Sequence, residues 1–220
     1  MHLWKEIGLL LRKEATLEWR QKYAISGILL YVLSTVFIVY MAFVQVEPVV
    51  WITLFWIIVL FASVNAIVKS FQQENSERQI YYYLLARPVA VLLAKIIYNT
   101  ALLLIISLLT FAAFAFVAGQ PVQDLPLYFL TITLGSVGFS ITLTFVSAVA
   151  AKASNAATLM AILSFPLIIP ILLTLIRLSL IALQGDNVEK IIAPDLMILG
   201  AIDLFLLGFG FFLFPFLWRD

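Results

Sequence analysis

Cysteine is absent from this chain of 220 residues, and histidine occurs once, as His2. Without cysteine the chain can form no disulfide, thiolate metal site or thiol nucleophile. One histidine beside the N-terminus excludes multi-histidine metal or haem sites and a Ser-His-Asp arrangement. We therefore expect no enzyme active site, no metal site and no cofactor bound by this chain.

A phosphate-binding loop is also missing. None of the nine glycines is followed by lysine, so the chain has no Gly-Lys-Ser/Thr motif and is not itself an ATPase. Any energy for work must come from a partner chain or an ion gradient. A proton-coupled carrier is expected to contain more buried acidic residues, and internal repeats are not evident.

Charged residues are scarce in this chain, and most residues are apolar. Only 11% of the residues are charged and the net charge is +1, which gives no argument for a nucleic-acid partner. By contrast, 64% are hydrophobic and the mean hydropathy is +1.12, well outside the range of soluble domains. So many apolar residues must face lipid, and the composition predicts an integral membrane protein.

The apolar residues fall into six long uncharged runs. A helix of about 20 residues crosses a hydrocarbon layer of about 30 Å, so each run is a candidate transmembrane helix. We expect one all-α transmembrane domain over 1–220, with an N-terminus that is not cleaved. Short connections containing proline join three pairs of neighbours, which should pack antiparallel. The predicted spans are 23–46, 49–68, 96–117, 127–150, 158–183 and 196–218.

Lysine and arginine lie almost entirely on one side of these spans. Cytoplasmic loops contain the excess of basic residues, so both termini are predicted to be cytoplasmic. The opposite side has only Lys190, and Arg177 falls inside the fifth run. The residues assigned to the cytoplasmic side are Lys5, Arg12, Lys13, Arg20, Lys22, Lys69, Arg78, Arg87, Lys95, Lys152 and Arg219.

Residues 1–22 precede the first span and have an amphipathic pattern. Apolar residues recur at helical spacing, with charged residues around the other side, which predicts a helix lying along the inner membrane surface. The alternative is a solvated helical leader. The predicted apolar face consists of Leu3, Trp4, Ile7, Leu10 and Leu11, and the charged side of Lys5, Glu6, Arg12, Lys13 and Glu14.

The longest polar interruption, 69–95, predicts a docking helix. Ser76 and Gln79 have the spacing of a capping box, and Pro88 should stop or kink the helix that starts there. Charges at its start and tyrosines beyond suit a cytoplasmic partner; alternatively, the tyrosines lie in the lipid headgroup layer. The predicted docking residues are Glu74, Ser76, Glu77, Arg78, Tyr81 and Tyr82.

Small and helix-breaking residues mark the fourth and fifth spans. Ser136, Ser140 and Thr144 recur every four residues, which predicts close packing against another helix, in this chain or a second copy. The alternative is a polar substrate path. Pro166 and Pro170 predict a kink or a break in the fifth span.

Two ionisable residues lie within predicted spans and are functional candidates for that reason. The fifth span either ends just before Arg177, leaving its side chain at the outer surface, or 177–195 forms a hairpin that re-enters the membrane. Asp203 lies near the outer end of the last span. It either forms a structural ion pair with Arg177 or remains hydrated.

Several segments together resemble a known family. The chain is similar to permease subunits of ATP-binding-cassette exporters, and most closely to the haem exporter protein B (CcmB) family of bacterial cytochrome c maturation. The matching segments are Lys13-Glu14-X-X-X-Glu18-X-Arg20, the loop 71–77 followed by Leu84-Leu85-Ala86-Arg87-Pro88 and Ala94-Lys95, and Phe165-Pro166-Leu167-Ile168-Ile169-Pro170.

The resemblance implies a permease in the bacterial inner membrane that works with a separate cytoplasmic ATPase subunit. It also implies other maturation membrane proteins as partners, and we expect a second permease copy. ATP would be bound by the partner, and haem is the implied cargo, or else a haem-loaded chaperone is released on the outer side. The alternatives are a scaffold that transports nothing, or a permease for a lipid or drug.

Overall fold

All described regular structure in the chain is α-helical. The computed structural model describes residues 3–20, 22–43, 46–68, 87–151, 155–185 and 189–219. The all-α prediction is confirmed for these residues. Their helices are α1 (Leu3–Arg20), α2 (Lys22–Ala42), α3 (Pro48–Ile67), α5 (Pro88–Ala118), α6 (Leu125–Ala150), α7 (Ala156–Gln184) and α8 (Glu189–Arg219).

Five of these helices, α3 and α5 to α8, are long and apolar enough to span a membrane. The apolar part of α2, Ser26–Ala42, is shorter than the other five segments. The described residues therefore show several membrane-length helices, and the sixth span remains a prediction.

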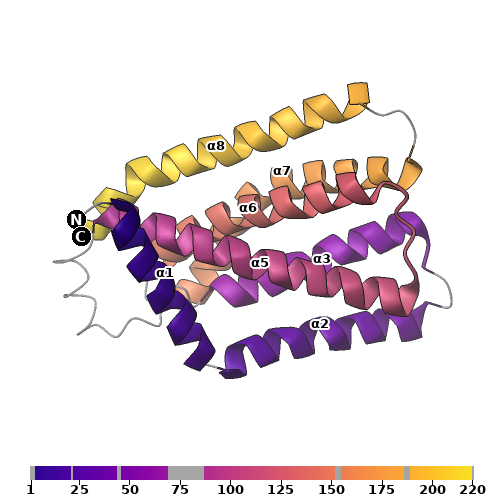
Figure 1. The fold of residues 1–220 in the computed structure, drawn as a ribbon, viewed down its shortest axis with the longest axis horizontal. Helices are drawn as coiled ribbons and strands as arrows, with labels where there is room; N and C mark the ends of the chain where they lie inside the picture. The colour runs from indigo at the N-terminus through magenta and orange to yellow at the C-terminus, as the bar shows by residue number, and fades with distance from the viewer. Residues whose placement is uncertain are drawn as a thin grey trace.

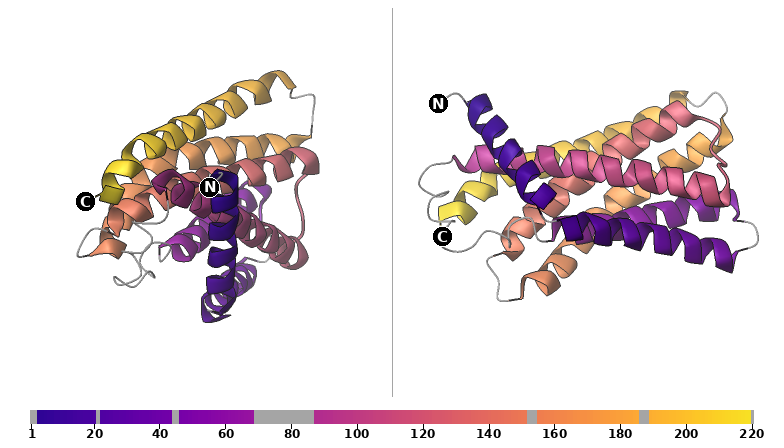
Figure 2. Two further views of the ribbon diagram at one scale, coloured as in Figure 1. Left: turned by 60° about the vertical axis from the view of Figure 1, so that its left-hand side comes forward. Right: turned by 60° about the horizontal axis from the view of Figure 1, so that its bottom comes forward.

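The long helices lie side by side, and α1 crosses one end of them obliquely (Figures 1 and 2). Both chain termini lie at this end, which we call the terminal end. The end of α3 and the start of α5 are there too (Figure 1). The ends of α2, α5 and α7 and the starts of α3, α6 and α8 lie at the opposite end (Figure 1).

Local chemistry explains where several helices begin and end. Asp124 and Asn155 cap α6 and α7, because their side-chain oxygens accept hydrogen bonds from Leu127 N (3.0 Å) and Thr158 N (3.4 Å). After α7, Gly185 has a φ of 68°, a left-handed conformation that favours glycine.

Two helices begin earlier than the sequence predicted. Pro88 stands in the first turn of α5, where the missing N–H group leaves no helical hydrogen bond unmade; the docking helix that it was predicted to stop or kink lies outside the described residues. α5 therefore begins before the predicted span, which starts at residue 96. Pro194, expected in a loop, lies inside α8, which begins at Glu189 and not at residue 196.

The fourth predicted span, α6, is the centre of the bundle. It packs against α3, α5, α7 and α8. Buried residues make up 67% of its apolar segment, against 22% for α8. Because α6 is surrounded by other helices, its small and polar residues face protein.

Candidate functional site

At the terminal end, α1 packs against the first turns of α5. Ile7 is buried between the two helices and contacts a small cluster that includes Ala90 and Ala94. Leu3, Leu10 and Leu11 add partly buried surface to this cluster. Alanines leave room for a second helix to approach closely, so the start of α5 is shaped to receive α1.

Two carboxylates of α1 also face α5. Glu6 Oε1 accepts a hydrogen bond from the backbone N–H of Arg87 at 2.7 Å, and Glu6 is only 9% exposed. Glu14 Oε1 lies 3.2 Å from Lys95 Nζ, and Lys95 is 2% exposed. Lys13 Nζ approaches the same Glu14 oxygen at 3.4 Å. We call this contact between α1 and α5 the α1–α5 junction.

The α1–α5 junction corrects the predicted faces of the N-terminal helix. Glu6 and Glu14 were placed on the charged outer side, yet both contact α5. Of the predicted apolar face, Leu3 and Ile7 pack on α5, whereas Trp4 is 76% exposed on the outside of the bundle, and its contact with the membrane surface stays a prediction. A carboxylate can turn toward a bundle when that bundle supplies an N–H group or an ammonium group.

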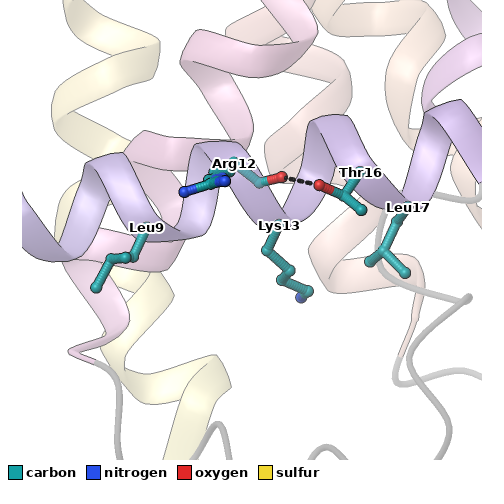
Figure 3. A pocket seen from close by; sticks show the side chains of 5 residues that line it. All are labelled: Leu9, Arg12, Lys13, Thr16 and Leu17. Atoms are coloured by element: carbon teal, nitrogen blue, oxygen red, sulfur yellow. Dashed lines mark hydrogen bonds between the residues drawn. The ribbon is translucent and has the colours of Figure 1, made fainter.

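The outward side of α1 has a groove of about 340 Å³. Its lining side chains all come from α1: Leu9, Arg12, Lys13, Thr16 and Leu17 (Figure 3). Leu9, Lys13 and Leu17 point to the same side (Figure 3), and Thr16 Oγ1 donates to Arg12 O at 2.7 Å. Among the described residues this groove has one wall, so it is a surface feature and not an enclosed substrate chamber.

A row of buried polar side chains runs along α6, and we call it the polar seam. Ser140 Oγ donates to Ile96 O of α5 at 2.8 Å, and Thr144 Oγ1 accepts from Asn99 Nδ2 at 2.8 Å. Nearer the end of α6, Ser147 Oγ donates to Ile67 O of α3 at 3.3 Å.

The small-residue pattern of α6 marked part of this seam. Ser136, the third residue of that pattern, donates within its own helix to Ile132 O at 2.8 Å. Ser140 and Thr144 face another helix of the same chain, while a role for them in assembly or transport remains a prediction. Asn99 was not foreseen, because a single asparagine in an apolar run gives no periodic signal.

Two glycines of α6 receive large or polar side chains from other helices. A Cβ atom on Gly135 would lie 2.7 Å from the ring of Trp56, whose Nε1 donates to Ser179 Oγ at 2.8 Å. A Cβ atom on Gly138 would lie 2.6 Å from Asp203 Oδ1. The missing side chains of these glycines form notches on α6, and side chains of α3, α7 and α8 occupy them.

The two ionisable candidates are not joined. Asp203 is 7% exposed, and its Oδ1 has no hydrogen-bond partner among the described residues. Arg177 is exposed, and no ion pair within the described ranges connects it to Asp203. The expected ion pair is therefore wrong for this structure, because Asp203 turns toward Gly138 of α6.

The helix that contains the fifth predicted span is longer than that span and is not broken. α7 continues through Pro166, Pro170 and Arg177 to Gln184 as one helix. Thr174 Oγ1 donates to the carbonyl of Pro170 at 2.9 Å within this helix. The end of α7 and the start of α8 cover the described part of 177–195, and whether the membrane ends before Arg177 or this segment re-enters it stays a prediction.

The predicted docking residues lie outside the described residues. They are Glu74, Ser76, Glu77, Arg78, Tyr81 and Tyr82, together with the rest of 69–86. The docking prediction therefore stays a prediction. Within the described part of the chain, no group of three histidine, aspartate or glutamate side chains could hold a metal ion.

Comparison with known proteins gives one informative result. No curated protein and no solved structure matches the chain. A family model described as CcmB protein matches residues 5–217, nearly the whole chain, and confirms the resemblance seen in the sequence. The chain therefore belongs to the CcmB family, the membrane permease component of a haem exporter for cytochrome c maturation.

Proposed function

We propose that this chain is the permease subunit of an ATP-driven exporter in the bacterial inner membrane. It crosses the membrane six times, with both termini in the cytoplasm, and a separate ATP-binding-cassette subunit supplies the energy. Membership of the CcmB family supports this proposal, as do five apolar helices of membrane length and the absence of a Gly-Lys motif.

The observation that carries the proposal is the arrangement at the terminal end. Five basic residues, Lys5, Arg12, Lys13, Arg87 and Lys95, lie in α1 or at the start of α5, which meet there (Figure 1). Toward the opposite end the described basic residues are Arg177 and Lys190, and the acidic residues Glu47 and Asp124 precede α3 and α6. This asymmetry supports a cytoplasmic terminal end.

The same arrangement supports docking of the ATPase through 69–95. The end of α3 and the start of α5, which precede and follow residues 69–86, both lie at the terminal end (Figure 1). A partner on the cytoplasmic side would thus meet a segment connected directly to α3 and α5. The motion of the ATPase would enter the bundle through these two helices.

The sequence favours release of a haem-loaded chaperone over passage of free haem through this chain. Histidine and cysteine are common axial ligands of haem iron, and the chain has only His2. The competing functions are a scaffold that binds maturation proteins without transport, and a permease for a lipid or drug.

The test replaces Glu74, Glu77 and Arg78 together with alanine. These residues lie outside the predicted spans, so we expect normal membrane insertion with loss of ATPase co-purification, of stimulated ATP hydrolysis and of cytochrome c maturation. Glu47→Ala, at an exposed acidic residue of the opposite end, is the matched control and should behave as wild type. Normal ATPase binding and maturation in the triple variant would place the docking site elsewhere. If the wild-type chain binds the ATPase without stimulating ATP hydrolysis, the scaffold is favoured.

A further inference from the structure

The α1–α5 junction fixes two helices at two points with matching spacing. Glu6 and Glu14 are eight residues apart on α1, and their partners Arg87 and Lys95 are eight residues apart on α5. Eight residues of helix extend about 12 Å. Two contacts separated by that distance resist rotation of one helix about the other, which a single contact would allow.

The first contact, between Glu6 and Arg87, caps the N-terminus of α5. Arg87 is the N-cap residue of α5, and its own side chain makes no capping hydrogen bond. Pro88, which follows, has no N–H group. The Glu6 carboxylate accepts the Arg87 N–H and places a negative charge at the positive end of the helix dipole. The capping hydrogen bond at the start of α5, which a residue next to the helix usually makes, is thus made by a residue of α1.

The second contact buries an ammonium group. Lys95 is 2% exposed, and Glu14 is the acid beside it at 3.2 Å. Removal of Glu14 takes the anion at 3.2 Å away from this buried ammonium group, and breaking a buried ion pair is strongly destabilising. Between the two contacts, Ile7 packs on the alanines of α5.

We propose that α1 and the first turns of α5 move as one rigid unit, and that Glu6 and Glu14 are positioning residues for coupling. The inference rests on the proposed function, since it takes the segment before Arg87 as the site where the ATPase acts. A displacement of that segment then carries α1 with α5. α5 is hydrogen-bonded to α6, since Ser140 Oγ donates to Ile96 O and Asn99 Nδ2 donates to Thr144 Oγ1. The displacement of α5 therefore reaches the polar seam.

A charge exchange tests the second contact in the complex with the ATPase. Glu14→Lys and Lys95→Glu should each retain ATPase binding but lose most of the stimulation of ATP hydrolysis and cytochrome c maturation. The double variant E14K/K95E should regain both, because opposite charges again face each other. Lys5→Glu changes a charge on the exposed side of α1 and should have no effect. Full activity in both single variants would overturn the proposal.

A covalent link tests the rigid unit itself. The chain has no cysteine, so Ile7→Cys and Ala90→Cys can be joined selectively by oxidation or by a short bis-maleimide. The linked protein should remain active, and the link should restore activity to Glu14→Ala until a disulfide is reduced. Complete linkage with loss of activity would show that α1 must move relative to α5, and the proposal would be wrong.

These outcomes are distinct from a failure of the proposed function. If the ATPase does not bind the wild-type chain, the proposed function fails. If the ATPase binds and responds to wild type but the junction variants respond equally well, only the rigid unit is refuted.

Discussion

At the scale of single residues, Trp56 is held in α3 by partners on two other helices. Its indole Nε1 donates to Ser179 Oγ of α7 at 2.8 Å, its ring lies over Gly135 of α6, and it meets Phe139 edge to face at 6.2 Å between ring centroids. The ring cannot move away from Gly135 without losing the hydrogen bond to Ser179. The space above that glycine is therefore fixed.

We predict that Gly135→Ala destabilises the protein. The new methyl group would lie 2.7 Å from the Trp56 ring and 3.0 Å from Leu175 Cδ1, and overpacking of this kind costs about 1–3 kcal/mol. Thermal unfolding in detergent measures the effect. Gly208→Ala is the control, since nothing lies within 4 Å of its added Cβ atom. Equal unfolding temperatures for the two variants would show that the bundle adjusts freely around Trp56.

At Gly138 we predict an interaction between two substitutions. Gly138→Ala places a methyl group 2.6 Å from Asp203 Oδ1, and this steric clash should lower stability. Asp203→Ala removes the oxygen atom with which the methyl group clashes. The double variant should therefore lose less unfolding free energy than the sum of the losses in the two single variants. Effects of substitutions at contacting residues are not additive. A double-mutant cycle of unfolding free energies measures this. Additive effects would mean that Asp203 does not lie in the Gly138 notch.

At the scale of helices, the polar seam joins α5 and α6. Ser140 is fully buried and donates to a backbone carbonyl of the neighbouring helix. Small side chains allow this approach, and interhelical hydrogen bonds in membranes contribute about 0.6 kcal/mol on average. Close packing therefore matters more here than the hydrogen bond alone.

We predict that Ser140→Leu disrupts the bundle more than Ser140→Ala does. Alanine loses one modest hydrogen bond, whereas leucine adds bulk where α5 and α6 approach each other. Yield of folded protein after extraction and cytochrome c maturation in cells are the readouts. Thr133→Leu, at an exposed hydroxyl on the same helix, is the matched control. Wild-type behaviour of Ser140→Leu would place that face of α6 in lipid.

At the scale of the whole molecule, the connections alternate between the two ends of the bundle (Figure 1). If the terminal end is cytoplasmic, residue 76 lies inside and residue 186 outside. We predict that cysteines introduced at Ser76 and Asp186 react with impermeant reagents from opposite sides of the membrane. The absence of native cysteine removes any background reaction. Equal labelling of both positions from outside would refute the six-span arrangement.

The predictions from sequence were best where one physical preference acts alone. The apolar runs located the long helices because burial of backbone polar groups in lipid leaves few alternatives to a helix. The starts of α5 and α8 were missed because the predicted spans were limited to uncharged runs, which begin after Lys95 and Asp195, whereas the helices begin at Pro88 and Glu189. Pro88 lies in the first turn of α5, where proline costs least, and it marks the start of that helix.

The sequence alone thus determined that the chain is a membrane protein, where its long helices lie and which face of α6 has small residues. Each of these depends only on nearby residues and on lipid as the solvent. Only the tertiary structure decided which way Glu6, Glu14 and Trp4 face. Glu6 and Glu14 find their partners 81 residues away, and the amphipathic pattern of α1 contains no information about those partners. A carboxylate is placed by the donor that meets it, and that donor is brought there by the fold.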